Sequence, residues 1–313
     1  MTIGIGAYGP RAGRAIYDAL AAAERVGVGA IRGFVSFAAI DKQGNILQSE
    51  TQRGGSTTLF TEGERTGVEP PSVISEAKFA GLISSGPDRP DPLSQFMLAD
   101  KEGGLITGHR IPNAVSASGH PMNEEALNLM IKGYTAREAI DTVIASNPEA
   151  DCGLIAVDCR GAAFARNTER VERRPDLGMA QRHDESTGAQ VLVLHNAIRP
   201  YPALADLVAN VALDTMMGEK APKGWITIDA GTPVEMGTEN AVHCDKEAVA
   251  TRIITTDPAI GVRGDVGAAI YLNSVVYVAG KNAGRTTFEP ITTMMDGCIT
   301  ELSGKTRLRM SYC

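Results

Sequence analysis

The sequence is poor in aromatic residues, has no paired-cysteine motif and carries no long apolar run. Aromatics make up 5% of the 313 residues, with a single tryptophan. Five cysteines without a C-x-x-C pair indicate free thiols in a reducing compartment rather than a disulfide framework. No stretch approaches the roughly 18 apolar residues of a membrane helix, and no signal peptide is visible. These absences predict a cytoplasmic protein with no membrane partner.

The charge balance excludes another class of partner. The formal net charge is -7 and the isoelectric point is near 5.4, so the chain repels phosphate backbones and is not expected to bind nucleic acid. Hydrophobic residues at 43% and charged residues at 21% are typical of a globular protein, and 34 glycines favour tight turns. A small-molecule partner is therefore expected, and a homo-oligomer is left open.

Predicted hairpins alternate with predicted helices along the chain. This order indicates a mixed α/β (α+β layered) fold, with helices outside antiparallel sheets. We expect one compact domain over 1–313, or a subdivision into 1–188 and 189–313. Residues 62–94 and 168–188 are interpreted as long loops. The periodicity predicts helices at 11–26, 123–131, 135–146 and 201–216, hairpins within 31–51, 95–111 and 153–167, strands at 56–61, 190–195 and 225–229, and a mostly β tail from about 251 to 312.

The first residues contain the spacing G-x-G-x-x-G at Gly4, Gly6 and Gly9. A dinucleotide-binding fold needs a full strand before this motif, and only three residues precede Gly4. We therefore interpret residues 2–9 as a flexible glycine-rich entry to the first helix. No cofactor is predicted.

A polar cluster ends the second hairpin. Thr107 and His109 lie two residues apart, so in a strand their side chains share one face, as a nucleophile and a base would require. Arg110 and Asn113 follow and could bind a substrate. An ordinary polar strand end explains the same residues equally well.

Arginines gather after the third hairpin. Four of them fall within residues 166–174 of an acidic chain, and their planar guanidinium groups suit carboxylate substrates. Thr168, Arg170 and Arg173 are the binding candidates here. A solvated surface loop is the slightly favoured alternative.

Two further sets of residues can be interpreted chemically. Residues 237–245 gather Glu239, His243 and Asp245, which would serve a metal-dependent enzyme, although the spacing matches no zinc pattern and no metal site is predicted. Thr2 stands where an N-terminal nucleophile enzyme has its hydroxyl, with the free α-amine as base. Met1 still precedes Thr2, which counts against that role.

Residues 114–167 carry a family resemblance. They contain the helix Asn123–Met130, then KGYTAREAIDTVIASNP, then CGLIAVDCRGAAFARNT. This unit resembles Ntn-hydrolase-like proteins, most closely a bacterial Ntn-like family with a GVVD-x-x-G hairpin. Proteasome-type subunits and isoaspartyl peptidases show a related A-x-D-x-x-G hairpin, and the MT-x-x-I start resembles both groups. The resemblance implies a four-layer αββα fold and hydrolysis of amide bonds.

The leading hypothesis is a hydrolase acting on the C–N bond of a small anionic amide or cyclic amide. Thr107 or Thr2 would attack or orient water, and His109 would carry the proton. Arg110, Arg170 and Arg173 would hold a carboxylate, while Asn113 or glycine-loop amides would stabilise the oxyanion. The alternatives are a non-catalytic small-anion-binding protein of the same fold and the metal-dependent enzyme.

Overall fold

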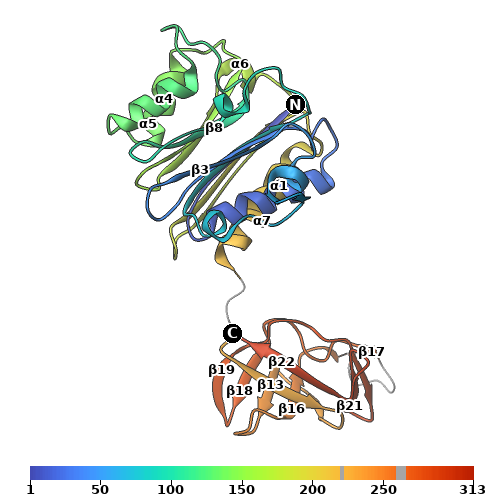
Figure 1. Ribbon diagram of the computed structural model, residues 1–313. Coiled ribbons are helices and arrows are strands. Elements are labelled where there is room, and N and C mark those ends of the chain that lie inside the picture. The colour runs from blue at the N-terminus through green and yellow to red at the C-terminus, as the bar shows by residue number, and fades with distance from the viewer. Residues whose placement is uncertain (219–221, 259–265) are drawn as a thin grey trace. The chain divides into compact units, whose positions relative to one another are not determined.

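The computed structural model describes residues 1–218, 222–258 and 266–313, which divide into two compact units, Met1–Gly218 and Glu219–Cys313 (Figure 1). The observed division differs from the subdivision at 188/189, because the segments on either side of that position belong to one sheet. Each unit is described by itself.

The first unit is built around a six-stranded antiparallel sheet. Its order is β11-β12-β1-β6-β2-β3. Helices α1 (Ala12–Val26) and α7 (Tyr201–Met217) cover one face, and their small and branched apolar side chains form the largest core with it. The strands are β1 (Thr2–Tyr8), β2 (Val35–Ile40), β3 (Ile46–Thr51), β6 (Phe79–Ser85), β11 (Leu177–Asp184) and β12 (Ala189–Asn196).

A second antiparallel sheet has the order β10-β9-β8-β7. Its outer face packs against the helices α4 and α5 in a separate core. Helix α5 begins with the predicted capping box, in which Thr135 and Glu138 exchange hydrogen bonds. The elements are β7 (Leu98–Asp100), β8 (Gly104–Arg110), α4 (Met122–Ile131), α5 (Ala136–Ala145), β9 (Cys152–Asp158) and β10 (Ala163–Asn167).

The inner faces of the two sheets pack against each other. Two apolar clusters join them, one of which contains Ile155 with Leu192 and Leu194. The first unit is therefore layered helix–sheet–sheet–helix, as Figure 1 shows. The backbones approach closely where Gly4 faces Gly108, because a Cβ on Gly4 would lie 2.2 Å from the Gly108 carbonyl oxygen. The expected mixed α+β fold with mostly antiparallel sheets is confirmed.

Three long strands of the first unit were not predicted, and one predicted strand is wrong. Residues 2–9 are the central strand β1 rather than a flexible entry, and the long loops expected at 62–94 and 168–188 contain β6 and β11. The strand predicted at 56–61 begins instead as a short helix, since Gly55 adopts a positive φ that starts a turn. The remaining short elements are α2 (Ser56–Leu59), β4 (Thr61–Glu62), β5 (Arg65–Thr66), α3 (Ser72–Ser75), the 3₁₀ helix η1 (Leu93–Phe96) and α6 (Glu169–Glu172).

The second unit is mostly β in its described residues, as the tail composition predicts. Its sheets have the orders β14-β16-β15-β18-β19, β17-β20-β21 and β13-β22, and they enclose a core of their own. No helix in the described parts of the chain is long and apolar enough to cross a membrane. The strands are β13 (Gly224–Asp229), β14 (Val234–Met236), β15 (Ala241–Cys244), β16 (Ala250–Thr255), β17 (Val266–Gly267), β18 (Val275–Val278), β19 (Lys281–Arg285), β20 (Thr292–Met295), β21 (Cys298–Leu302) and β22 (Arg307–Tyr312).

Candidate active site

Strand ends from both sheets of the first unit meet at Thr2. Thr2 is the first residue of β1, and its cross-strand partners are Asn196, the last residue of β12, and Ser85, the last residue of β6. Arg110 ends β8 on the facing sheet and donates its backbone N–H to Thr2 Oγ1 at 2.6 Å. Antiparallel pairing therefore brings Thr2, Ser85 and Asn196 to one edge, and the packing of the two sheets adds Arg110.

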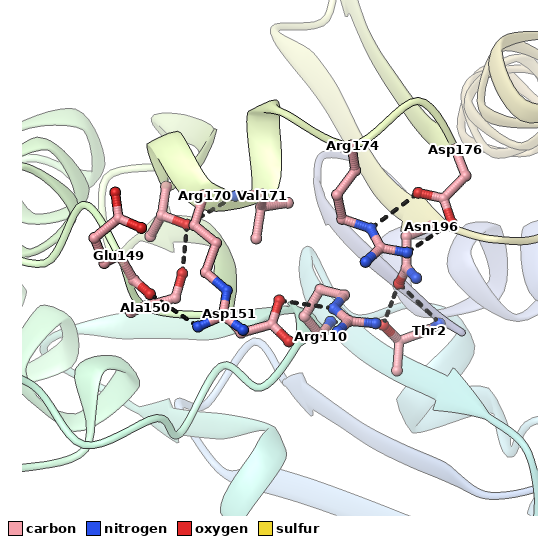
Figure 2. Close-up of polar contacts among 11 residues, drawn as sticks. Thr2, Arg110, Glu149, Ala150, Asp151, Arg170, Val171, Arg174, Asp176 and Asn196 are labelled. Carbon is pink, nitrogen blue, oxygen red and sulfur yellow. Dashed lines mark hydrogen bonds and ion pairs between the residues drawn. The ribbon is translucent and has the colours of Figure 1, made fainter.

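The Thr2 hydroxyl is held by hydrogen bonds on two sides (Figure 2). Its Oγ1 donates to Asn196 Oδ1 at 3.0 Å, and the Thr2 backbone N–H donates to the same oxygen at 3.2 Å. Thr2 is only 4% exposed and Asn196 is fully buried. The amide nitrogen and the hydroxyl of Thr2 are therefore fixed relative to each other by one carboxamide.

Two residues beside Thr2 adopt left-handed backbone conformations that L-residues rarely take. Arg110 has φ 65° and Ala197, directly after Asn196, has φ 56°. Such strained residues cluster at functional sites, where the surrounding structure has to enforce them. The left-handed turn at Arg110 ends β8 where its backbone N–H meets the Thr2 hydroxyl.

Thr2 lines two small neighbouring cavities. One has a volume of about 240 Å³ and is also lined by Arg89, Arg110 and Asn113, with apolar walls that include Phe34. The other, of about 210 Å³, lies between Met1, Thr2, Arg89, Arg110 and Ile111. A larger hollow of about 730 Å³, lined by α4, α5 and the segment before α4, shares none of these residues. The Thr2 cavities are thus small, polar on one side and apolar on the other.

Three arginines, two of them paired with aspartates, lie around the amino end of the chain. Arg110 pairs with Asp151 through two hydrogen bonds, and Arg174 pairs with Asp176 at 2.7 Å (Figure 2). Burial, and then the nearby Arg110, Arg89 and Arg174, lower the pKa of the Met1 amine. The Arg110 guanidinium likewise lowers the pKa of Asp151.

Thr107 and His109 share a face of β8, as the alternation predicts, but neither lines the Thr2 cavities. Thr107 is buried between the sheets and donates to the Leu82 carbonyl at 3.1 Å. His109 is fully buried, with Nε2 2.7 Å from Asn167 Oδ1. Burial lowers the pKa of His109 to about 4, so its imidazole is neutral near pH 7. The structure therefore separates this pair from the cavity where Thr2 lies.

The buried side chains of His109 and Asn196 lie near each other. With Asn167 Oδ1 as acceptor, His109 Nε2 carries the ring proton and Nδ1 is an acceptor. His109 Nδ1 and the amide nitrogen Asn196 Nδ2 both lack a hydrogen-bond partner among the described residues. The Asn196 side chain is close enough to act on the pKa of His109. His109 thus lies behind the carboxamide that holds Thr2.

Of the other expected binding residues, Asn113 lies at a Thr2 cavity, whereas Thr168 and Arg173 do not line either cavity. Asn113 lines the larger Thr2 cavity, and its amide nitrogen donates to Gln95 Oε1 at 2.8 Å. Thr168 is fully buried and caps α6, accepting from Val171 N and donating to the Ala150 carbonyl. Arg173 pairs with Glu149 on the surface.

Arg170 is exposed and donates to the Glu149 carbonyl at 3.3 Å, beside Asp151 in Figure 2. Of the arginines between 166 and 174, it is Arg174 that acts on the Met1 amine. Within the predicted arginine cluster it is therefore Arg174, and not the expected Arg170 or Arg173, that acts on the Thr2 site.

The segment 237–245 lies in the second unit. The His243 ring stacks on Tyr277 with centroids 4.8 Å apart, and the Tyr277 hydroxyl donates to Glu239. Within residues 1–218, 222–258 and 266–313, no three His, Cys, Asp or Glu side chains converge as metal ligands would. His243 therefore packs against the neighbouring strand β18, and Asp245 accepts hydrogen bonds from the backbone of Glu247 and Val249.

Comparison with known families supports the division into two units. Residues 2–225 match the family described as a domain of unknown function, DUF6963, which covers more than half of the chain. The chain belongs to the DUF6963 family. Residues 231–307 match a second domain of unknown function, DUF7259. No curated protein matches the chain. The DUF6963 match includes Thr2 and its hydrogen-bond partners Arg110 and Asn196.

Sequence reasoning missed several residues of this DUF6963 site. Asn196 and Ser85 end strands whose partner in β1 was not recognised, so nothing indicated that they face Thr2. Arg89 lies in the segment interpreted as a loop. Asp151 lies between α5 and β9, immediately before the predicted strand, and no local pattern marks it as a partner of Arg110. An available signal was the His195-Asn196 end of a strongly apolar strand, since polar residues at such ends are often functional.

Proposed function

We propose that the first unit is an amide hydrolase of the Ntn type, in which removal of Met1 makes Thr2 the nucleophile. The observation that carries this proposal is the Thr2 hydroxyl, which lines a small cavity and shares one carboxamide oxygen with its own backbone nitrogen. The helix–sheet–sheet–helix layers of the unit and the position of Thr2 at the start of a central strand support the resemblance.

In the proposed reaction Thr2 Oγ1 attacks the carbonyl carbon of the substrate amide, and the free Thr2 amine accepts the hydroxyl proton. The proton then passes to the leaving nitrogen as the C–N bond breaks, which leaves an acyl ester on Thr2. Water attacks this ester with the same amine as base, so the products are a carboxylate and an amine. Burial and the nearby arginines lower the pKa of the present terminal amine, and we expect the same direction for Thr2.

The developing oxyanion needs a donor close to Thr2. The Ser85 hydroxyl donates to the Met1 carbonyl oxygen, the carbonyl bonded to the Thr2 nitrogen. A donor is thus directed at a carbonyl oxygen next to the nucleophile before any substrate binds. We propose Ser85 as the oxyanion donor, in preference to Asn113, whose amide nitrogen is engaged by Gln95.

Thr2 is preferred to Thr107, and His109 is given a positioning role. Thr107 has its hydroxyl directed at a backbone carbonyl inside the sheet interface. His109 is fully buried and its pKa is lowered by burial. We therefore expect it to influence Thr2 only through Asn196. Both features argue against direct contact of either residue with a substrate.

The experiment combines intact mass with a turnover assay. The mass of the purified chain should lack Met1, and a β-lactone probe should label Thr2, as peptide mass analysis would show. A panel of small amides read by ammonia release should then give turnover that Thr2→Ala abolishes and Thr107→Val retains. Retention of Met1 together with Thr2-independent turnover would reject the proposal.

A small-anion-binding protein of the same fold is the second candidate. It is favoured by the Met1 side chain, whose sulfur accepts a hydrogen bond from the Ala30 backbone and which lines the smaller cavity. A chain that keeps Met1, turns over no amide and is stabilised by carboxylates on heating would support this function. The arginines around the site serve either function.

A further inference from the structure

Arg89 lines both Thr2 cavities. Its guanidinium carbon lies 5.0 Å from the Phe34 ring centroid, and its Nη2 donates to Ser85 Oγ at 3.1 Å. In the described residues Arg110 and Arg174 each pair with an aspartate, whereas no ion pair joins Arg89 to any acidic side chain. Asp91 also lines the larger cavity, but it forms no ion pair with Arg89.

The Ser85 hydroxyl lies between the Arg89 guanidinium and the Met1 carbonyl group next to Thr2. Ser85 Oγ accepts from Arg89 and donates to the Met1 carbonyl oxygen, so the three groups form a chain toward Thr2. A carboxylate on Arg89 would therefore be separated from the attacked carbonyl by only a few bonds. The apolar walls of the cavity, Phe34, Ile83 and Phe96, suit a short hydrocarbon link.

The cavity volume limits the length of that link. About 240 Å³ lies below the roughly 300–1,000 Å³ of pockets that hold drug-sized ligands. Arg guanidinium groups bind carboxylates through two parallel hydrogen bonds, and this one lies over the Phe34 ring. Size, charge and apolar walls together describe a short chain with a carboxylate at its far end.

We propose that Arg89 binds a carboxylate at the far end of the acyl part of the substrate. The substrate is then a monoamide of a short dicarboxylic acid such as succinic or glutaric acid. This inference rests on the proposed function, because Thr2 defines the acyl end. It assigns Arg89 as a specificity-determining residue, and it leaves Arg170 and Arg173 outside the site.

The test measures binding without turnover. Isothermal titration of the full chain with succinate and glutarate, and with the corresponding neutral diamides, should show binding of the dicarboxylates only. Arg89→Met should weaken dicarboxylate binding by 10-fold or more, Arg89→Lys should weaken it less, and Arg173→Met should leave it unchanged. Circular dichroism establishes that each variant is folded. Equal binding by wild type and Arg89→Met, or no preference for the charged ligands, would overturn the assignment.

The same variants separate this inference from the proposed function. Thr2→Ala should retain dicarboxylate binding while losing amide turnover and probe labelling. Thr2-dependent hydrolysis of neutral amides with unchanged rates in Arg89→Met would reject Arg89 and keep the hydrolase. Arg89-dependent dicarboxylate binding without any Thr2-dependent turnover would reject the hydrolase and keep Arg89 as an anion site.

Discussion

At the scale of single residues, Asn196 is the group on which the orientation of Thr2 depends. Its Oδ1 accepts from both the hydroxyl and the backbone nitrogen of Thr2. We expect Asn196→Ala to lower kcat for amide turnover by about 100-fold, because a nucleophile displaced by about 1 Å loses that much rate. Steady-state kinetics check this, with Asn210→Ala on the exposed face of α7 as a matched control. Unchanged kcat in Asn196→Ala would contradict the positioning role.

Thr107 offers the contrasting test, since the sequence makes it as good a nucleophile as Thr2. Thr107→Val keeps the shape of the side chain and removes its hydrogen bond to the Leu82 carbonyl. We expect unfolding free energy to fall by about 1 kcal/mol, the usual net value of such a bond, and turnover to stay within a factor of two or so. Urea unfolding and the amide assay measure the two effects. Loss of turnover in a folded Thr107→Val variant would indicate that Thr107 takes part in the reaction.

Burial of His109 gives stability a defined dependence on pH. Its pKa falls from an ordinary 6.5 to about 4 in the folded chain, so between these values the unfolded chain binds a proton that the folded chain does not. Unfolding free energy should therefore decrease as pH falls from 6.5 to 4, by up to about 3 kcal/mol. Burial lowers the pKa of His195 in the same direction, while burial raises that of Glu24 and acts oppositely.

A variant isolates the His109 contribution from these others. Urea unfolding of wild type and His109→Gln at pH 7 and pH 5 should show a smaller loss of stability on acidification in the variant. His195 and Glu24 are common to both chains, so they cancel in the comparison. Parallel decreases in the two proteins would show that His109 does not titrate as its burial requires.

At the scale of elements, the glycines of β1 explain the G-x-G-x-x-G spacing without a phosphate. Gly4 lies against the backbone of Gly108, and a Cβ on Gly6 would lie 2.7 Å from the Ile155 side chain. We expect Gly4→Ala to force the sheets apart next to Thr2 and to cost about 1–3 kcal/mol, the usual range for overpacking. Thermal unfolding measures this, and Gly267→Ala, where a Cβ would have nothing within 4 Å and φ is not positive, serves as a control for substitution at a glycine.

The same elements show what the sequence reveals about the fold and what it hides. Hairpins with alternating side chains and turn residues were predictable, as were α5 with its capping box and the β-rich tail. The strands β1 and β6 were not, because they are buried on both faces and rich in small residues, so they show no alternation. Sheet order, which brings the end of β12 to the start of β1, depends on long-range pairing that no local pattern encodes.

The site was predictable only where its residues had a local signal. Thr2, Arg110 and Asn113 were among the expected residues and do line one cavity. Thr107 and His109 share a face as expected, yet that face points into the sheet interface, which local alternation cannot distinguish from a cavity. Asn196, Ser85 and Arg89 belong to the site only because β12, β1 and β6 are neighbours.

At the scale of the whole molecule, the two units have separate cores. Five apolar clusters draw all their residues from Met1–Gly218, and the sixth draws all of its residues from the second unit. The two family matches divide the chain in nearly the same place. Among the described residues, the hydrogen-bond partners of Thr2 lie in the first unit, so we expect the proposed chemistry not to need the second.

A chain ending at Gly218 tests this independence. It retains the two large sheets and the long helices α1, α4, α5 and α7, so we expect it to fold cooperatively and to bind the same carboxylates as the full chain. Its unfolding midpoint in urea should match one of two transitions of the full chain, since each core is built from its own unit. Circular dichroism and titration with glutarate measure folding and binding. A truncated chain that is folded but binds no carboxylate would show that the second unit completes the site, and one that fails to fold would show that the cores stabilise each other.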